Sequence, residues 1–231
     1  MGPFRVSPGS AGPWSARPER IVVIGDSNGN GTTADTTYGG AAIPAGWTVR
    51  DAGANLATWP AAGTPSVGAL PYLIALATAA GSTGGWVIRP SVNGSGASDL
   101  LSSQFANVSA DVTALANGTP ELVVIVTGAN DAQSTAERDA YPGEMRHAIE
   151  VIRERWPSAR IVCVGEHHTS GSYDYLPDNV AALAVIATEY GTAVRYADCT
   201  AHALADGIHF SQSSGGGQED VAASVWTEAT S

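Results

Sequence analysis

Residues 21–27 read Ile-Val-Val-Ile-Gly-Asp-Ser, a short β-branched run that ends in a Gly and two polar residues. A continuous apolar run of this kind is typical of a strand buried on both faces of a parallel sheet. Ligands of parallel sheets bind at the carboxyl ends of the strands. Asp26 and Ser27 therefore fall where a binding site is expected.

Further strand and helix candidates alternate along the chain. Strands are expected at Trp86–Val92, Glu121–Val126, Ile161–Val164 and Ala193–Tyr196. Helices are expected at Ser66–Ala80, Ala97–Asn117, Glu144–Trp156, Asn179–Tyr190 and Glu219–Glu228. The alternation predicts an α/β fold, a three-layer α/β/α sandwich with a doubly wound, five-stranded parallel sheet.

The domain organisation follows from the segments outside this pattern. Residues 1–19 are rich in Pro, Gly, Ser and Arg, which is typical of an extended arm. Residues 20–231 are expected to form a single domain. Within it, residues 28–65 consist mainly of Gly, Thr, Ala and Pro, and we expect them to form a long insertion over the site.

Charge and glycine spacing exclude several function classes. All 11 basic residues are Arg, so no Walker-A lysine, Schiff-base lysine or lysine general base is present. The net charge of −11 argues against nucleic acid as a partner and favours a neutral substrate over a polyanionic one. Gly25, Gly29 and Gly31 miss the dinucleotide-binding spacing, which disfavours a nucleotide-binding module.

Apolar runs along the chain are shorter than the ~18 residues that a membrane helix needs, so no membrane span is predicted. Residues 1–20 lack the apolar core of a signal peptide. The location stays open between cytoplasmic and secreted with a signal removed. The oligomeric state stays open as well.

Metal and disulfide sites have little support in the sequence. Cys163 and Cys199 are either two small buried thiols or a bridge between neighbouring strands. Neither cysteine has metal-ligand spacing, and the pair His167-His168 lacks a third ligand nearby. The sequence therefore predicts no metal and no cofactor.

Polar residues follow every predicted strand. They are Asp26, Ser27 and Asn28, then Asn93–Ser98, then Asn130 and Asp131, then Glu166, His167 and His168, and finally Asp206 and His209. Because the carboxyl ends of parallel strands meet at one edge of a sheet, these side chains are expected to lie close together. They include a hydroxyl nucleophile, an imidazole base, a carboxylate and amide donors, which are the parts of an acyl-transfer site.

Three motifs in this order resemble those of the SGNH (GDSL-type) hydrolase family. Ile24–Ser27 matches the family's first block, Gly128–Asp131 its third block G-x-N-D, and Asp206–Ser211 its last block D-x-x-H. The resemblance runs from about residue 20 to the end of the chain. It implies the flavodoxin-like fold of these hydrolases and a carboxylic ester hydrolase activity.

The second block departs from the family's pattern, and two glycines compete for it. Gly53 lies closer in sequence to Ser27. Gly96 follows a convincing strand and precedes a helix, as the family topology requires. We favour Gly96, because choosing Gly53 would leave the strand at Trp86–Val92 unexplained.

The resemblance also implies a role for each site residue. Ser27 would attack an ester carbonyl after His209 removes its proton, and Asp206 would orient the imidazole. The backbone N–H groups of Ser27 and Gly96 and the side chain of Asn130 would hold the oxyanion.

The substrate class is inferred from weaker features. Ser27-Asn28 and Gly68–Leu70 resemble the carbohydrate O-acetylesterase branch, although the Gln that usually precedes the Ser is Asp26 here. Asp26 is expected to cap the first helix turn. We expect short-chain acyl esters, above all acetyl esters of carbohydrates. Two alternatives stay open, a lipase- or thioesterase-type enzyme for longer acyl chains and a non-catalytic binding domain.

Aromatic and His side chains near the site are candidate substrate contacts. Trp47 and Trp59 lie in the expected insertion, where they could stack on a substrate or pin the loop to the domain. His167 and His168 could contact substrate or lie exposed in a loop. We retain Trp59 and His167 as substrate-binding candidates.

Overall fold

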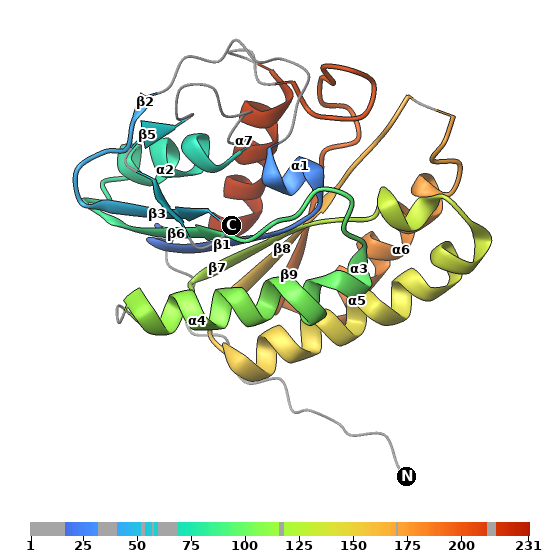
Figure 1. The fold of residues 1–231 in the computed structure, drawn as a ribbon, viewed down its shortest axis with the longest axis horizontal. Helices are drawn as coiled ribbons and strands as arrows, with labels where there is room; N and C mark the ends of the chain where they lie inside the picture. The colour runs from blue at the N-terminus through green and yellow to red at the C-terminus, as the bar shows by residue number, and fades with distance from the viewer. Residues whose placement is uncertain are drawn as a thin grey trace.

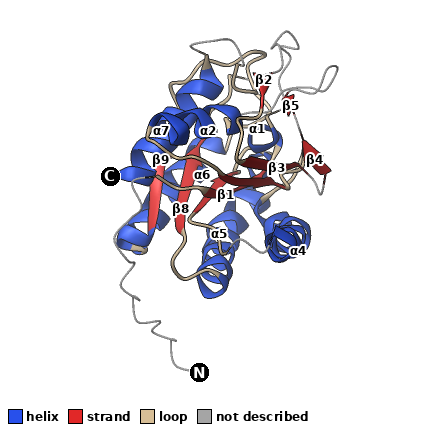
Figure 2. Cartoon of the chain, turned by 90° about the vertical axis from the view of Figure 1, so that its left-hand side faces the viewer, coloured by secondary structure: helices blue, strands red, loops and turns tan. Residues whose placement is uncertain are grey.

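The computed structural model describes residues 17–31, 41–51, 54–56, 58–59, 69–115, 118–169, 171–211 and 216–231. These residues form a central sheet with helices packed on both of its faces (Figures 1 and 2). The chain is a mixed α/β protein, which confirms the fold class that the alternating pattern predicts.

The main sheet contains seven strands of the described residues. Their bounds are β1 Arg20–Gly25, β3 Trp47–Asp51, β4 Ala54–Leu56, β6 Gly85–Arg89, β7 Leu122–Val126, β8 Arg160–Gly165 and β9 Val194–Asp198. They lie in the order β4-β3-β6-β1-β7-β8-β9. Strand β4 pairs antiparallel with β3 at one edge, and the other pairings are parallel. Two short strands, β2 (Ala41–Ala42) and β5 (Thr58–Trp59), form a separate antiparallel pair.

The sheet differs from the five-stranded one that the sequence predicts. Strands β3 and β4 come from residues 28–65, for which the sequence predicts a long insertion over the site and no strand of the sheet. In β3, Trp47 and Val49 are buried whereas Thr48 between them is exposed. This alternation indicates a strand. It extends over only five residues among Gly, Thr, Ala and Pro, so the sequence alone does not reveal it.

Helices cover both faces of the sheet. Their bounds are α1 Ser27–Asn30, α2 Leu70–Ala79, α3 Ala97–Asp99 with a π-helical turn at Leu100–Gln104, α4 Phe105–Leu115, α5 Thr135–Arg155, α6 Leu176–Glu189 and α7 Gly217–Thr230. Side chains of α2 and α7 share one apolar core with Ile21 and Val23 of β1. Those of α4, α5 and α6 share the other core with Val22 and Ile24. Since β1 enters both cores, its side chains are apolar on both faces, and the three-layer sandwich is confirmed.

No helix among the described residues is both long and apolar enough to cross a membrane.

Helix α5 differs most from its sequence prediction. It begins at Thr135 and continues through Pro142, whereas the sequence predicts a start after that proline. Ser134 caps the helix, because its hydroxyl accepts the N–H of Glu137 at 3.3 Å and donates to Glu137 Oε2 at 2.9 Å. Tyr141 is fully buried in the core. Capping and burial together offset the backbone hydrogen bond that the proline lacks.

The two cysteines are free and buried. Cys163 lies in β8, and Cys199 directly follows β9. Burial raises the pKa of each thiol to about 12. Of the two alternatives from the sequence, the structure contains the pair of small buried thiols.

Gly25 ends β1 at the point where the chain turns toward Ser27. It has a φ of +145°, and a Cβ there would lie 1.8 Å from the carbonyl oxygen of Val126 in β7. We expect Gly25→Ala to lower the free energy of unfolding by about 2–6 kcal/mol, through positive-φ strain and overpacking. Chemical denaturation measures this change.

Gly143 supplies a matched control in α5. It is exposed, and no heavy atom lies within 4 Å of a Cβ built there. We expect Gly143→Ala to raise the free energy of unfolding by about 1 kcal/mol, because Gly is a poor helix former. Equal stability of Gly25→Ala and the wild type would contradict the close approach of β1 to β7.

Candidate active site

Ser27, Asp206 and His209 are in hydrogen-bond contact, although they are far apart in the sequence. His209 Nε2 lies 3.0 Å from Ser27 Oγ, and His209 Nδ1 lies 2.8 Å from Asp206 Oδ2. Ser27 begins α1 directly after β1, and the other two residues lie in the segment that follows β9. The structure thus brings together the three side chains to which the sequence assigns the acyl-transfer chemistry.

Asp206 organises the loop that carries His209. Its Oδ1 accepts the backbone N–H of Ile208 at 2.9 Å and that of His209 at 2.7 Å. Burial by itself would raise the pKa of Asp206, but hydrogen bonds from the His209 side chain and from the two backbone groups outweigh it and lower the pKa to about 2. The carboxylate is therefore ionised at neutral pH and can stabilise an imidazolium.

The three groups expected to hold an oxyanion differ in whether their N–H already has an acceptor. Asn130 Nδ2 donates one hydrogen bond to the carbonyl of Ser95 at 3.0 Å, and its second N–H has no acceptor in the described part of the chain. The backbone N–H of Ser27 likewise meets no acceptor among the described residues. The Gly96 N–H donates to Asp99 Oδ2 at 3.0 Å. Two of the three donors are thus available, whereas the third already caps α3.

Gly96 lies in the turn between β6 and α3, at the edge of the sheet where β1 ends. It follows β6, which pairs directly with β1. A Cβ at Gly96 would lie 2.5 Å from Asp131 Oδ1, so the turns after β6 and β7 are in close contact. Asp131 accepts the N–H of Ala97 at 2.9 Å across this contact. The competing Gly53 lies outside the described residues, and β3, which precedes it, pairs with β6 rather than with β1.

Asn28 and Glu166 are part of the site, although the sequence predicts no role for them. Asn28 Nδ2 donates to Glu166 Oε1 at 2.7 Å and to the carbonyl of Ile208 at 3.3 Å, and its Oδ1 accepts the N–H of Phe210 at 3.0 Å. The contacts with the loop lie on either side of His209. Both side chains are buried, with 3% and 1% exposed. Their positions in the sequence indicate the site, because Asn28 directly follows Ser27 and Glu166 directly follows β8.

Asp26 caps α1 as the sequence predicts. Its Oδ1 accepts the backbone N–H of Asn28 at 2.9 Å. The side chain is fully buried.

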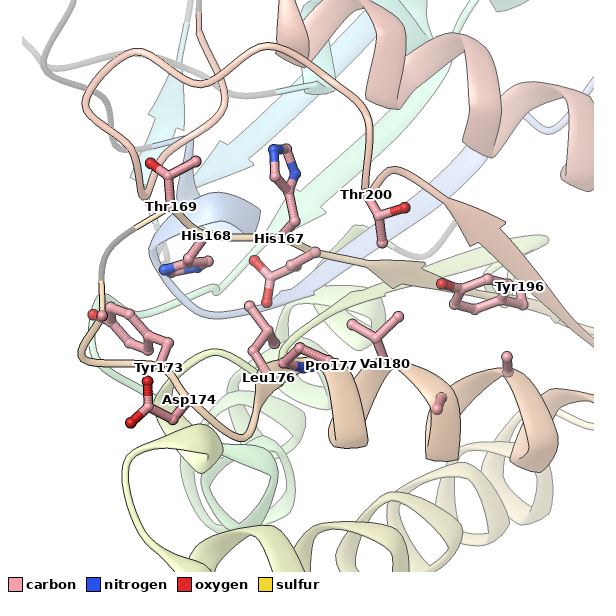
Figure 3. A pocket seen from close by; sticks show the side chains of 14 residues that line it. His167, His168, Thr169, Tyr173, Asp174, Leu176, Pro177, Val180, Tyr196 and Thr200 are labelled. Carbon is pink, nitrogen blue, oxygen red and sulfur yellow. The ribbon is translucent and has the colours of Figure 1, made fainter.

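His167 and His168 line a cavity of about 640 Å³ between the segment after β8 and helix α6 (Figure 3). Its apolar wall comes from one side of α6, namely Leu176, Pro177, Val180, Ala181 and Ala184. The His168 ring packs on Tyr173 with centroids 4.2 Å apart, and burial lowers the pKa of His168 to about 4. The next residue, Thr169, donates its N–H to the carbonyl of Gly207 at 2.9 Å. One wall of the cavity therefore contacts the loop that carries His209.

Of the two tryptophans expected near the site, the structure describes the side chain of Trp47 alone. Trp47 is 7% exposed and packs in the core shared with α2 and α7, so it holds β3 to the domain. Trp59 lies in β5, and its side chain is outside the described part of the chain. Substrate contact by Trp59 stays a prediction.

Solved structures with a similar fold match almost the whole chain. A protein from Arabidopsis thaliana has a TM-score of 0.68 at 14% identity, covering 92% of this chain and 96% of its own. A variant of an acetyl xylan esterase from Geobacillus stearothermophilus has a TM-score of 0.61 at 17% identity, with 93% and 97% covered. For a lipase/acylhydrolase from Enterococcus faecalis the TM-score is 0.60 at 19% identity, with 91% and 94% covered.

The chain has the fold of the SGNH hydrolases. No protein-family model and no curated protein matches the sequence. At such low identities the likeness establishes the SGNH fold and leaves the reaction to be argued from the site. The contacts among Ser27, His209 and Asp206 indicate that reaction.

The role of the hydrogen bond between Asp206 and His209 can be tested by substitution of Asp206. We expect Asp206→Asn to lower kcat for an activated ester by about 10²–10⁴-fold with little change in KM, because the neutral amide no longer stabilises the imidazolium. Steady-state kinetics separate the two parameters. Asp198→Asn is the matched control, since Asp198 is an exposed carboxylate at the end of β9. A loss confined to KM would contradict the expected role of Asp206.

Proposed function

We propose that the protein is a serine ester hydrolase that works through an acyl-enzyme. The observation that carries the proposal is the hydrogen-bonded chain from Asp206 through His209 to Ser27, with distances of 2.8 and 3.0 Å. These contacts match the geometry that nucleophilic catalysis by a hydroxyl requires. The alternative of a non-catalytic binding domain gives no reason for an aligned carboxylate, imidazole and hydroxyl.

The proposed reaction begins with proton transfer from Ser27 Oγ to His209 Nε2. The alkoxide attacks the ester carbonyl, and the N–H of Ser27 and the free N–H of Asn130 stabilise the oxyanion. Gly96 can add a third hydrogen bond only if its N–H leaves Asp99, which caps α3. His209 then protonates the departing alcohol, and a water molecule hydrolyses the acyl-enzyme by the same sequence of proton transfers.

The proposed substrates are short-chain acyl esters, with acetyl esters of carbohydrates first. Neutral donors in the proposed oxyanion site and a net charge of −11 support a neutral ester. A second candidate is an acylhydrolase for longer chains. The cavity with the apolar wall from α6 favours this candidate, because its volume of about 640 Å³ is large enough for a longer acyl chain.

We also propose that residues 20–231 form one domain and that residues 1–19 are an arm that precedes it. The end of this arm contacts the domain, since the N–H of Glu19 donates to Glu121 Oε2 at 2.7 Å. Residues 1–16 lie outside the described part of the chain. Limited proteolysis followed by mass measurement would test this division.

The central test compares p-nitrophenyl acetate hydrolysis by the wild type and by Ser27→Ala. We expect the variant to lose about 10⁴–10⁶-fold in kcat, because no other hydroxyl takes the place of the nucleophile. Ser102→Ala is the control, since Ser102 is exposed in the π-helical turn, and its rate should equal that of the wild type. Equal rates for Ser27→Ala and the wild type would overturn the proposed function.

A second experiment separates the two substrate classes. We expect the rate on p-nitrophenyl esters to be highest for the acetyl or butyryl ester and to fall with chain length, and acetate to be released from acetylated xylan. A rate maximum at the octanoyl ester or longer would contradict the short-chain proposal and support the acylhydrolase candidate.

A further inference from the structure

Two buried carboxyl groups meet next to Ser27. Asp26 follows β1 and is 0% exposed, and Glu166 follows β8 and is 1% exposed. Asn28 donates a hydrogen bond to each of them, so the two carboxyl groups lie around the same residue. Neither forms an ion pair with an Arg or a His of the described residues. A buried pair of this kind cannot keep two negative charges at neutral pH, because like charges in contact repel.

Each of the two acids has one carboxyl oxygen with a hydrogen-bond donor and one without. Asp26 Oδ1 accepts the N–H of Asn28 at 2.9 Å, and Glu166 Oε1 accepts Asn28 Nδ2 at 2.7 Å. The remaining oxygens, Asp26 Oδ2 and Glu166 Oε2, are buried and have no donor among the described residues. A single proton between these two oxygens would satisfy both of them.

Burial has the expected effect on both acids. It is the largest cause of the raised pKa of Glu166, to about 7, and of Asp26, whose pKa lies well above its ordinary value of 3.8. For Asp26 the charge of Glu166 adds to the effect of burial. Both directions agree with a pair that retains a proton.

Asn28 connects this pair to the proposed general base. Besides its bonds to the two acids, it donates to the carbonyl of Ile208 at 3.3 Å and accepts the N–H of Phe210 at 3.0 Å. His209 lies between these two contacts. A displacement of Asn28 would therefore move the imidazole relative to Ser27.

We propose that Asp26 and Glu166 share one proton and that, through Asn28, they act as positioning residues which hold His209 against Ser27. This inference rests on the proposed function for the roles of Ser27 and His209. The pair carries a single negative charge in the working enzyme. Loss of the shared proton leaves two carboxylates in contact, whose repulsion disrupts the bonds to Asn28.

Other titratable groups face the pair from the elements packed around it. They are Asp131 after β7, Tyr141 of α5, Cys199 after β9, His167 and His168 after β8, and His209. Burial keeps most of them neutral, since it raises the pKa of the thiol and the phenol and lowers the pKa of His167 and His168. Burial also raises the pKa of Asp131 to about 6. The titration of Asp131 must therefore be separated from that of the pair.

The first test is the pH dependence of kcat for p-nitrophenyl acetate in the wild type, Asp26→Asn and Glu166→Gln. We expect the wild-type kcat to fall at alkaline pH by about tenfold per pH unit as the shared proton leaves. In either variant the side-chain amide supplies an N–H that does not titrate, so the alkaline fall should disappear. The same alkaline fall in both variants would overturn the proposal.

Two further variants separate the pair from other effects. Asp131→Asn removes a buried carboxyl outside the pair, so it should keep the alkaline fall of the wild type. Asn28→Ala should lower kcat by about 10²-fold at every pH with KM nearly unchanged, because it releases the loop on both sides of His209. A loss in KM alone would overturn the positioning role of Asn28.

A measurement without substrate tests the shared proton itself. Because folding raises both pKa values, the folded chain keeps protons that the unfolded chain releases. Stability should therefore fall as the pH rises from the ordinary values of 3.8 and 4.5 through about 7. In Asp26→Asn and in Glu166→Gln this fall in the midpoint of denaturation should be smaller.

The unfolding and activity results can be told apart. A smaller fall in the variants supports the shared proton even where the wild type hydrolyses no ester, an outcome that would overturn the proposed function alone. Parallel pH dependences of unfolding in the wild type and both variants overturn the shared proton.

Discussion

The site depends on the parallel pairing of β1 with β6 on one side and with β7 on the other. Parallel strands end at the same edge of the sheet, so the residues after these three strands become neighbours although about 100 positions separate the first segment from the last. Gly25 allows the close approach, because a Cβ there would collide with the carbonyl of Val126. The chain can then turn sharply from β1 into α1, whose first residue is Ser27.

Hydrogen bonds from backbone and amide groups fix the position of the loop that carries His209. Asp206 is held by two backbone N–H groups of its own loop, and Asn28 joins that loop to the end of β8 through Glu166. None of these contacts uses a cation. The protein can therefore build the site without a lysine and with a net charge of −11, because neutral donors stabilise negative charge without attracting polyanions.

The sequence predicts the layers and the main site residues because both depend on local patterns. Apolar runs followed by Gly and polar residues identify β1, β7 and β8, and the spacing of Asp206 and His209 identifies the loop. The sequence does not predict β3, whose alternation is only five residues long, nor the start of α5, where tertiary packing outweighs the effect of Pro142. It also does not predict the role of Asn28 and Glu166, because no motif pairs a residue after β1 with one after β8. Likewise, the cap that occupies the Gly96 N–H depends on the conformation at Asp99 and not on the motif.

In the proposed reaction Ser27 is a nucleophile that His209 activates. The most direct measurement is covalent labelling with a fluorophosphonate, followed by mass spectrometry to locate the modified residue. We expect one phosphonyl group on Ser27 of the wild type, and labelling that is slower by orders of magnitude in His209→Ala. No label on the folded wild type, a label on another serine, or equal labelling rates in the two proteins would contradict this role of Ser27.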